Sequence, residues 1–167
     1  MNFNKTKNVG QVRFNGHVWR IASDFSDAAD ALFDSDSQKF VYPILMNYAF
    51  ACELALKACS VQTRYNCEPP GIGLIPSASF KPTSYGHDLE KLFDQLSPDT
   101  RGSVSNEYKY ITSEELCSQL ALFKDYFVDV RYSFEQKSQT YDLSGLRRLA
   151  NGLVAAVLEA GRKSEGF

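Results

Sequence analysis

The sequence predicts an all-α protein, a bundle of about five helices that carries a β-hairpin at its N-terminus. Two observations predict this class. Apolar residues recur every three or four positions over several segments, and one segment is apolar on nearly every side, as in a buried central helix. With 167 residues, 44% of them hydrophobic, the chain is long enough to fold as one domain without disulfides or a metal.

The N-terminal hairpin is predicted from the dipeptide Asn15-Gly16, which favours a two-residue type I′ turn. Around this turn, residues 11–14 can pair with residues 17–20, and the alternation places apolar side chains on one face. Because an isolated hairpin is marginally stable in water, we expect this face to pack on the helices. Residues 1–22 are therefore predicted to be an appendage of a helical bundle formed by residues 23–163.

Two helices are predicted to follow the hairpin. Ser23 or Asp24 can cap the first, which extends to Phe33. The second covers residues 40–61 and tolerates Pro43, because this proline falls in the first helical turn. This second segment is apolar on nearly every side, so we expect it to be the buried central helix.

Residues 62–84 are predicted to be a long loop inserted in the bundle. Their prolines and glycines exclude a continuous helix, although a short strand is compatible with residues 73–75. Loops of this length are uncommon and often functional. A short helix then follows over residues 88–96, which Asp88 can cap and which Ser97-Pro98 stops.

The C-terminal part of the chain is predicted to contain two amphipathic helices. The first opens at Ser113, a suitable N-cap, and runs to Phe134 with an apolar stripe that faces a core or a partner. The second covers residues 144–160, and Gly161 is predicted to end it. These two helices complete the bundle.

Charge and cysteine usage narrow the function classes. The formal net charge is -2 at pH 7, which disfavours a sequence-independent coat on nucleic acid but leaves room for a local basic cleft. No segment is long and apolar enough to span a membrane, and the N-terminus lacks the apolar core of a signal peptide, so we expect no membrane partner and a cytoplasmic location. The four cysteines show neither disulfide nor zinc-ligand spacing, so we expect inert thiols and neither metal nor cofactor.

Charged side chains in otherwise apolar helices are the candidate site residues. Glu53 and Lys57 lie one turn apart on the central helix, where they form an exposed ion pair or line a polar cleft. Arg131 lies beside an apolar stripe, where it pairs with Glu135 on the surface or binds a phosphate with its planar donors. His87, at the entry of the short helix, holds the long loop in place or acts as a general base.

Three short motifs occur in an order that resembles the HEPN superfamily. They are Glu53-Leu54-Ala55-Leu56-Lys57-Ala58, His87-Asp88-Leu89-Glu90-Lys91-Leu92-Phe93 and Arg131-Tyr132-Ser133-Phe134-Glu135. The resemblance covers approximately residues 24–160. It implies a small α-helical domain of the kind found in prokaryotic phage-defence, toxin–antitoxin and RNA-processing systems, and it implies a homodimer.

The resemblance also implies a function. Many members are metal-independent RNases whose site, at the dimer cleft, uses an arginine and a histidine four to six residues later. Arg131 matches the arginine, but residues 135–137 are glutamate, glutamine and lysine, so the histidine is missing. We therefore expect a non-catalytic homodimer that binds RNA, a nucleotide or a protein partner. Its predicted ligand-binding residues are Arg131, Lys57, Glu53, Tyr132 and His87.

Two alternatives stay open. One is a metal-independent RNase with a rearranged active site, for which the catalytic candidates are Arg131, Glu135 and His87. The other is a purely structural adaptor, which would bind no nucleic acid at any salt concentration. The low net charge, which offers no long-range attraction for RNA, disfavours the RNase.

Overall fold

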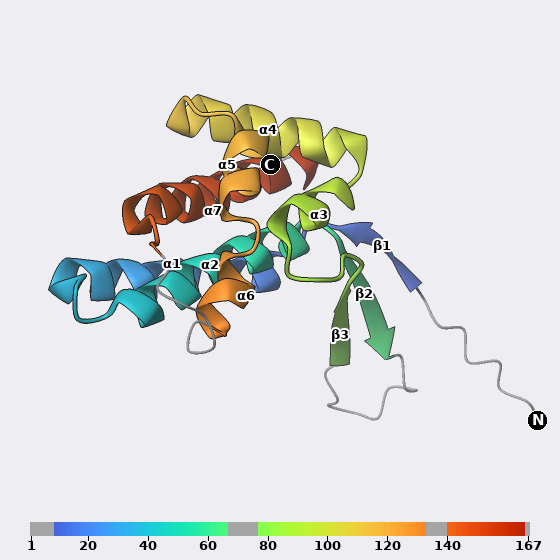
Figure 1. Cartoon of the computed structure of the whole chain (residues 1–167). Coiled ribbons are helices and arrows are strands. Elements are labelled where there is room, and N and C mark those ends of the chain that lie inside the picture. The colour runs from blue at the N-terminus through green and yellow to red at the C-terminus, as the bar shows by residue number, and fades with distance from the viewer. Residues whose placement is uncertain (1–8, 67–76, 133–139, 166–167) are drawn as a thin grey trace, which may run out of the picture.

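The structure, a computed structural model, describes residues 9–66, 77–132 and 140–165. It consists mainly of helices, with a small antiparallel sheet at one end (Figure 1). The helices are α1 (Gly16–Asp36), α2 (Val41–Ala58), α3 (Leu89–Asp94), α4 (Pro98–Thr112), α5 (Leu116–Phe123), α6 (Tyr126–Arg131) and α7 (Leu143–Glu165). The strands are β1 (Val9–Arg13), β2 (Val61–Asn66) and β3 (Ser77–Pro82). None of the described helices is long and apolar enough to cross a membrane.

Helix α2 is the central helix, as predicted. It packs against α1, α3, α6 and α7, and Pro43 lies in its first turn, where a missing amide costs no hydrogen bond. Its fully buried apolar residues include Ile44, Leu45, Tyr48, Ala51, Cys52, Ala55 and Leu56. Because α2 is enclosed on so many sides, any charge that it carries must find a partner or an opening.

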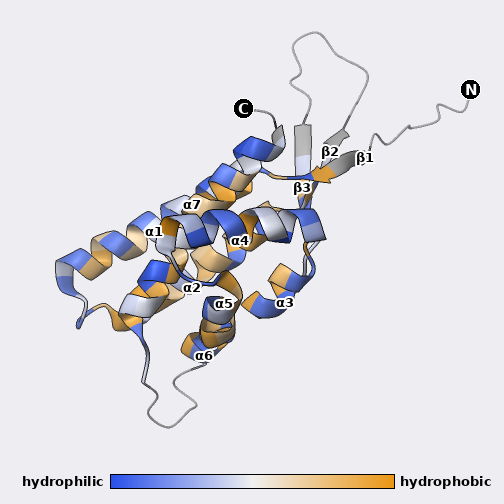
Figure 2. Cartoon of the chain, turned by 90° about the horizontal axis from the view of Figure 1, so that it is seen from above, coloured by the Kyte–Doolittle hydropathy of each residue, from blue (hydrophilic) through white to orange (hydrophobic). Residues whose placement is uncertain are grey.

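The predicted hairpin at Asn15-Gly16 is wrong, because this dipeptide begins α1. Asn15 Oδ1 accepts a hydrogen bond from the Val18 amide at 2.9 Å, which is the geometry of an N-cap. The buried face of α1 consists of small residues: Ala22, Ser26 and Ala29. Residues 17–22 therefore belong to the helical body. Figure 2 shows hydrophilic and hydrophobic residues alternating along α1, as expected of an amphipathic helix.

Residues 9–13 pair with a distant segment instead of a neighbouring one. Strand β2 lies between β1 and β3 and is antiparallel to both. The predicted loop over residues 62–84 thus contains parts of two strands, and the strand expected at residues 73–75 lies outside the described residues. Because Pro82 pairs with Val61, strand β3 returns the chain to the C-terminal end of α2.

Helix α3 has the predicted N-cap, Asp88, but it ends at Asp94, two residues before the predicted end at residue 96. The dipeptide Ser97-Pro98 that follows it also begins a helix, α4. The Ser97 hydroxyl accepts from the Thr100 amide, and Pro98 stands at the start of the helix, where proline is favoured. Ser113 does not cap the next helix as predicted. It has a left-handed backbone, with φ of 62°, and ends α4.

The helix predicted from Ser113 to Phe134 is divided into α5 and α6. At the division, the Lys124 carbonyl accepts a hydrogen bond from the amide of Leu89, the first residue of α3, at 3.2 Å. This tertiary hydrogen bond takes the place of one that would continue the helix. The spacing of apolar residues along the chain does not reveal such a contact. Helix α6 ends at Arg131, with Tyr132 as its C-cap, so the predicted end at Phe134 is wrong.

Helix α7 continues past Gly161, so this glycine does not end the helix as predicted. The absence of a side chain instead allows close packing. A Cβ atom added at Gly161 would lie 2.6 Å from the Phe14 ring, well inside van der Waals contact. Glycine at position 161 therefore leaves room for the ring of Phe14, the residue that follows β1.

Substitution of Gly161 by alanine is expected to lower the free energy of unfolding by roughly 1–3 kcal/mol, because the Phe14 ring must move. Gly102→Ala in α4 is the matched control. Nothing lies within 4 Å of a Cβ atom at Gly102, so alanine should stabilise by about 0.5–1 kcal/mol through its helix propensity. Urea unfolding followed by circular dichroism measures both. Stabilisation by both variants would contradict the packing role of Gly161.

Candidate functional site

Glu53 is a buried carboxylate that holds two basic side chains. It lies on α2 with its side chain 3% exposed. Its Oε1 accepts a hydrogen bond from Lys57 Nζ at 2.6 Å, and its Oε2 is 2.9 Å from His87 Nδ1. An ionised carboxylate can only accept hydrogen bonds, so His87 carries a proton on Nδ1 and presents Nε2 to a further partner. The predicted pair of Glu53 and Lys57 is confirmed, and His87 joins it.

Aromatic rings fix the plane of the His87 imidazole. The imidazole stacks on Phe127 of α6, with ring centroids 5.1 Å apart. Phe127 stacks on Phe50 of α2, and Phe50 meets the edge of Phe25 of α1. The His87 side chain is nevertheless 51% exposed. One ring face and one nitrogen of His87 are therefore held by the protein, while the remainder is open to solvent.

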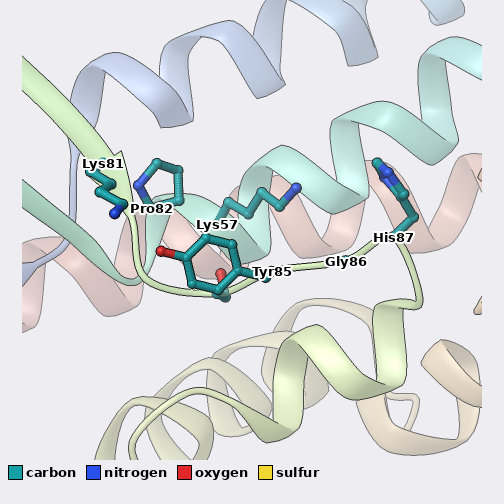
Figure 3. A pocket seen from close by; sticks show the side chains of 7 residues that line it. Lys57, Lys81, Pro82, Tyr85, Gly86 and His87 are labelled. Carbon is teal, nitrogen blue, oxygen red and sulfur yellow. The ribbon is translucent and has the colours of Figure 1, made fainter.

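A pocket of about 310 Å³ lies where the segment between β3 and α3 passes over α2 (Figure 3). It is lined by Lys57, Lys81, Pro82, Ser84, Tyr85, Gly86 and His87. Figure 3 shows the Lys57 side chain extending toward His87, with Lys81 and Pro82 on the opposite side of Tyr85. Basic side chains from α2, β3 and the following segment thus line one pocket, although the chain as a whole is weakly acidic.

Ser84 adds a buried hydroxyl to this pocket. The residue is 2% exposed, and its Oγ has no hydrogen-bond partner among the described residues. A buried hydroxyl without a partner is uncommon, because its desolvation costs about 1–3 kcal/mol. A polar ligand atom in the pocket would supply the missing partner.

The structure brings three of the predicted site residues together and places two others elsewhere. Glu53, Lys57 and His87 form the cluster described above. Arg131 and Tyr132 lie exposed at the C-terminal end of α6, with the Arg131 guanidinium carbon 5.7 Å from the centre of the Tyr132 ring. Neither residue lines the pocket.

Of the residues that line the pocket, the sequence predicted only Lys57 and His87, and it missed Lys81, Pro82, Ser84, Tyr85 and Gly86. Lys81 and Ser84 fall at the end of the segment that is predicted to be a loop, Tyr85 follows it directly, and the pairing of β3 with β2 places them beside α2. A local signal was available in Gly86, whose φ of 108° requires glycine. Glu135 lies outside the described residues, so its expected pairing or catalytic role stays a prediction.

Two of the described cysteines, Cys52 and Cys59, are covered by the protein, whereas Cys117 is exposed. Among the described residues, no group of three or more histidine, cysteine, aspartate or glutamate side chains is placed to hold a metal ion. Burial raises the pKa of the Cys52 thiol, and burial raises the pKa of Cys59 to about 12. Both therefore stay protonated at neutral pH, where a thiol is a poor nucleophile and a poor metal ligand.

Comparison with known proteins adds no functional assignment: no family model, curated protein or solved structure matches the chain. The resemblance to the HEPN superfamily therefore stays a prediction that rests on the three short motifs. The function must be argued from the geometry of the pocket.

Proposed function

We propose that the protein binds a phosphate-bearing ligand, a nucleotide or RNA, in the pocket beside Glu53. The observation that carries this proposal is the convergence of Lys57, Lys81 and His87 on one pocket, two of them held by the same buried carboxylate. Lysine ammonium groups are suitable donors to phosphate oxygens, and charge-assisted hydrogen bonds of this kind are strong. His87 donates from Nε2 only in its doubly protonated form, because its Nδ1 proton is held by Glu53. The buried Ser84 hydroxyl offers one further donor.

The basic side chains of the cluster are more exposed than the carboxylate, which suits an anion that enters from solvent. Glu53 is the deepest group, with 3% of its side chain exposed, while Lys57 is 17% and His87 51% exposed. An incoming phosphate therefore meets the basic groups before the carboxylate. The Lys57 ammonium group offsets the negative charge of Glu53. The carboxylate therefore orients Lys57 and His87 while repelling an anionic ligand less than an unpaired carboxylate would.

This pocket supports a binding function in preference to the RNase alternative. The RNase alternative relies on Arg131 beside a proton-transfer residue, and Arg131 does not line the pocket. A non-catalytic domain needs only the cationic cluster, which the described residues provide. Membership of the HEPN superfamily, the homodimer, a protein partner and a role in defence or toxin–antitoxin systems stay predictions.

The substitution Lys81→Met is expected to weaken the binding of ribose 5-phosphate roughly tenfold, because it removes one charge-assisted hydrogen bond. Lys81 is exposed on β3, so its loss should leave the fold intact. A heteronuclear NMR titration measures the dissociation constant, and the shifting amides should include those of Gly86 and His87. Raising the salt concentration should weaken binding to the wild-type protein.

Lys109→Met provides the matched control. Lys109 is an exposed lysine on α4 that pairs with Glu115 and does not line the pocket, so its loss should leave the dissociation constant unchanged. Absence of any shift with ribose 5-phosphate, or equal effects of the two lysine substitutions, would refute the proposed site.

A further inference from the structure

We infer that the ligand carries an unpaired nucleobase, which stacks on the exposed ring of Tyr85 while its phosphate binds to basic side chains that flank this ring. Lys57 and His87 lie on one side of the ring and Lys81 lies on the other (Figure 3). The site then takes one nucleoside monophosphate unit, either free or within single-stranded RNA. This inference rests on the proposed function and adds the class of ligand to it. Its basis is the rigid mounting of an exposed aromatic ring next to the cationic cluster.

Tyr85 combines an exposed side chain with a fixed backbone. Tyr85 is 63% exposed. Its amide donates to Gln95 Oε1 at 2.9 Å, and its carbonyl accepts from Gln95 Nε2 at 3.0 Å. Gln95 Nε2 also donates to the Lys91 carbonyl of α3. A large ring on a backbone that is already ordered loses little conformational entropy on binding, which is typical of binding hot spots.

The residues on either side of Tyr85 are fixed as well. The Thr83 amide donates to the Ser60 carbonyl at 2.9 Å, and the Thr83 and Ser60 hydroxyls are hydrogen-bonded to each other. Gly86 makes a turn with positive φ, which leads directly to His87 and its bond to Glu53. The stacking surface and the His87 imidazole are thus set two residues apart in one ordered segment.

The pocket has the walls that a flat, partly apolar group requires. Among the described residues, the Tyr85 ring has no aromatic partner and no cation over it, in contrast to the stacked ring of His87. Pro82 adds a second apolar wall, and basic groups lie at both ends (Figure 3). Every nucleobase presents a π-face, so stacking of this kind tolerates any base sequence.

The size and openness of the pocket favour an unpaired unit. A volume of about 310 Å³ lies at the lower end of the range of roughly 300–1,000 Å³ that is usual for small-molecule sites. A base in a duplex is covered on both faces by its neighbours, so it has no face to offer to Tyr85. We therefore expect selection of single-stranded over double-stranded RNA.

The test compares ligands with and without a base on matched variants. NMR titration with AMP, UMP and ribose 5-phosphate should show that both nucleotides bind the wild-type protein more tightly than the sugar phosphate. Tyr85→Ala should weaken nucleotide binding roughly tenfold, a size usual for loss of base stacking, and should weaken ribose 5-phosphate binding by much less. Tyr85→Phe keeps the ring and should bind like the wild type. Tyr110→Ala removes an exposed tyrosine on α4 that does not line the pocket and should have no effect.

A second comparison distinguishes the sources of the unit. A single-stranded tetraribonucleotide that binds more tightly than AMP would assign the site to RNA, and equal affinity would assign it to free nucleotides. Equal binding of ribose 5-phosphate and the nucleotides would overturn the inference and leave the phosphate site intact. If none of these ligands binds, the proposed function fails and the inference fails with it. Tight binding of a blunt RNA duplex that is unaffected by Tyr85→Ala would also overturn the inference.

Discussion

Replacing Glu53 with alanine is expected to lower the free energy of unfolding by about 3 kcal/mol, the largest effect of any single change at the site. The substitution leaves Lys57, whose side chain is only 17% exposed, without its counter-charge. It also releases His87 from its anchor, so binding of ribose 5-phosphate should be lost. Urea denaturation measures the stability, and NMR titration of the folded variant measures the binding.

Two further variants separate stability from binding. Glu53→Gln retains the shape and one acceptor oxygen, so we expect a smaller loss of stability than with alanine. The double variant Glu53→Leu, Lys57→Met removes both charges and should recover much of the stability, because replacing a buried ion pair by apolar residues is often neutral. It should still fail to bind the sugar phosphate. Wild-type stability of Glu53→Ala would contradict the buried ion pair.

Replacing Asp30 with alanine is expected to cost a similar amount, about 3 kcal/mol, because several groups lose one shared acceptor. Asp30 of α1 accepts from the Tyr48 hydroxyl of α2 at 2.5 Å and from Arg147 Nε of α7 at 2.7 Å. Asn151 Nδ2 donates to the same carboxylate at 3.0 Å. Tyr48 is fully buried, so its hydroxyl would be left without a partner. Thermal or urea unfolding measures the loss, and stability within 1 kcal/mol of wild type would contradict it.

The pH dependence of stability gives a second readout of the same network. Burial, followed by the hydrogen bond to Asp30, raises the pKa of Tyr48 above its ordinary value of 10.0. The folded state therefore holds this proton more tightly than the unfolded state. Its contribution is complete below pH 10 and is lost as the pH rises toward the pKa of the folded protein. Tyr48→Phe should reduce the loss of stability between pH 9 and 11, whereas Tyr110→Phe, at an exposed position, should not.

Much of the helical body was predictable from local pattern. The continuous apolar character of residues 40–61 identified the central helix, although α2 ends at Ala58 and Val61 begins β2. Helical spacing identified α3 and α7. Such patterns succeed because a helix buries a periodic stripe whatever lies against it. The same method failed at Asn15-Gly16, since asparagine serves equally well in a type I′ turn and as an N-cap. The packing of Ala22, Ser26 and Ala29 into the core, together with the N-cap hydrogen bond of Asn15, shows that the helix prevails.

The candidate site was likewise predictable from the sequence only in part. The spacing of Glu53 and Lys57 on one helix face was sufficient to predict their ion pair, because residues four apart in a helix are neighbours. The third partner, His87, lies 34 positions from Glu53 in the chain, and no local rule joins such positions.

What the sequence by itself determined is therefore the helical class, the central helix and the charged pair upon it. What only the tertiary structure decided is the pocket. The pairing of β3 with β2 brings Lys81 to the end of α2, and the turn at Gly86 directs His87 to Glu53. The physical reason is that helices follow from short-range periodicity, whereas strand pairing and a shared buried carboxylate depend on contacts between residues that are distant in the chain.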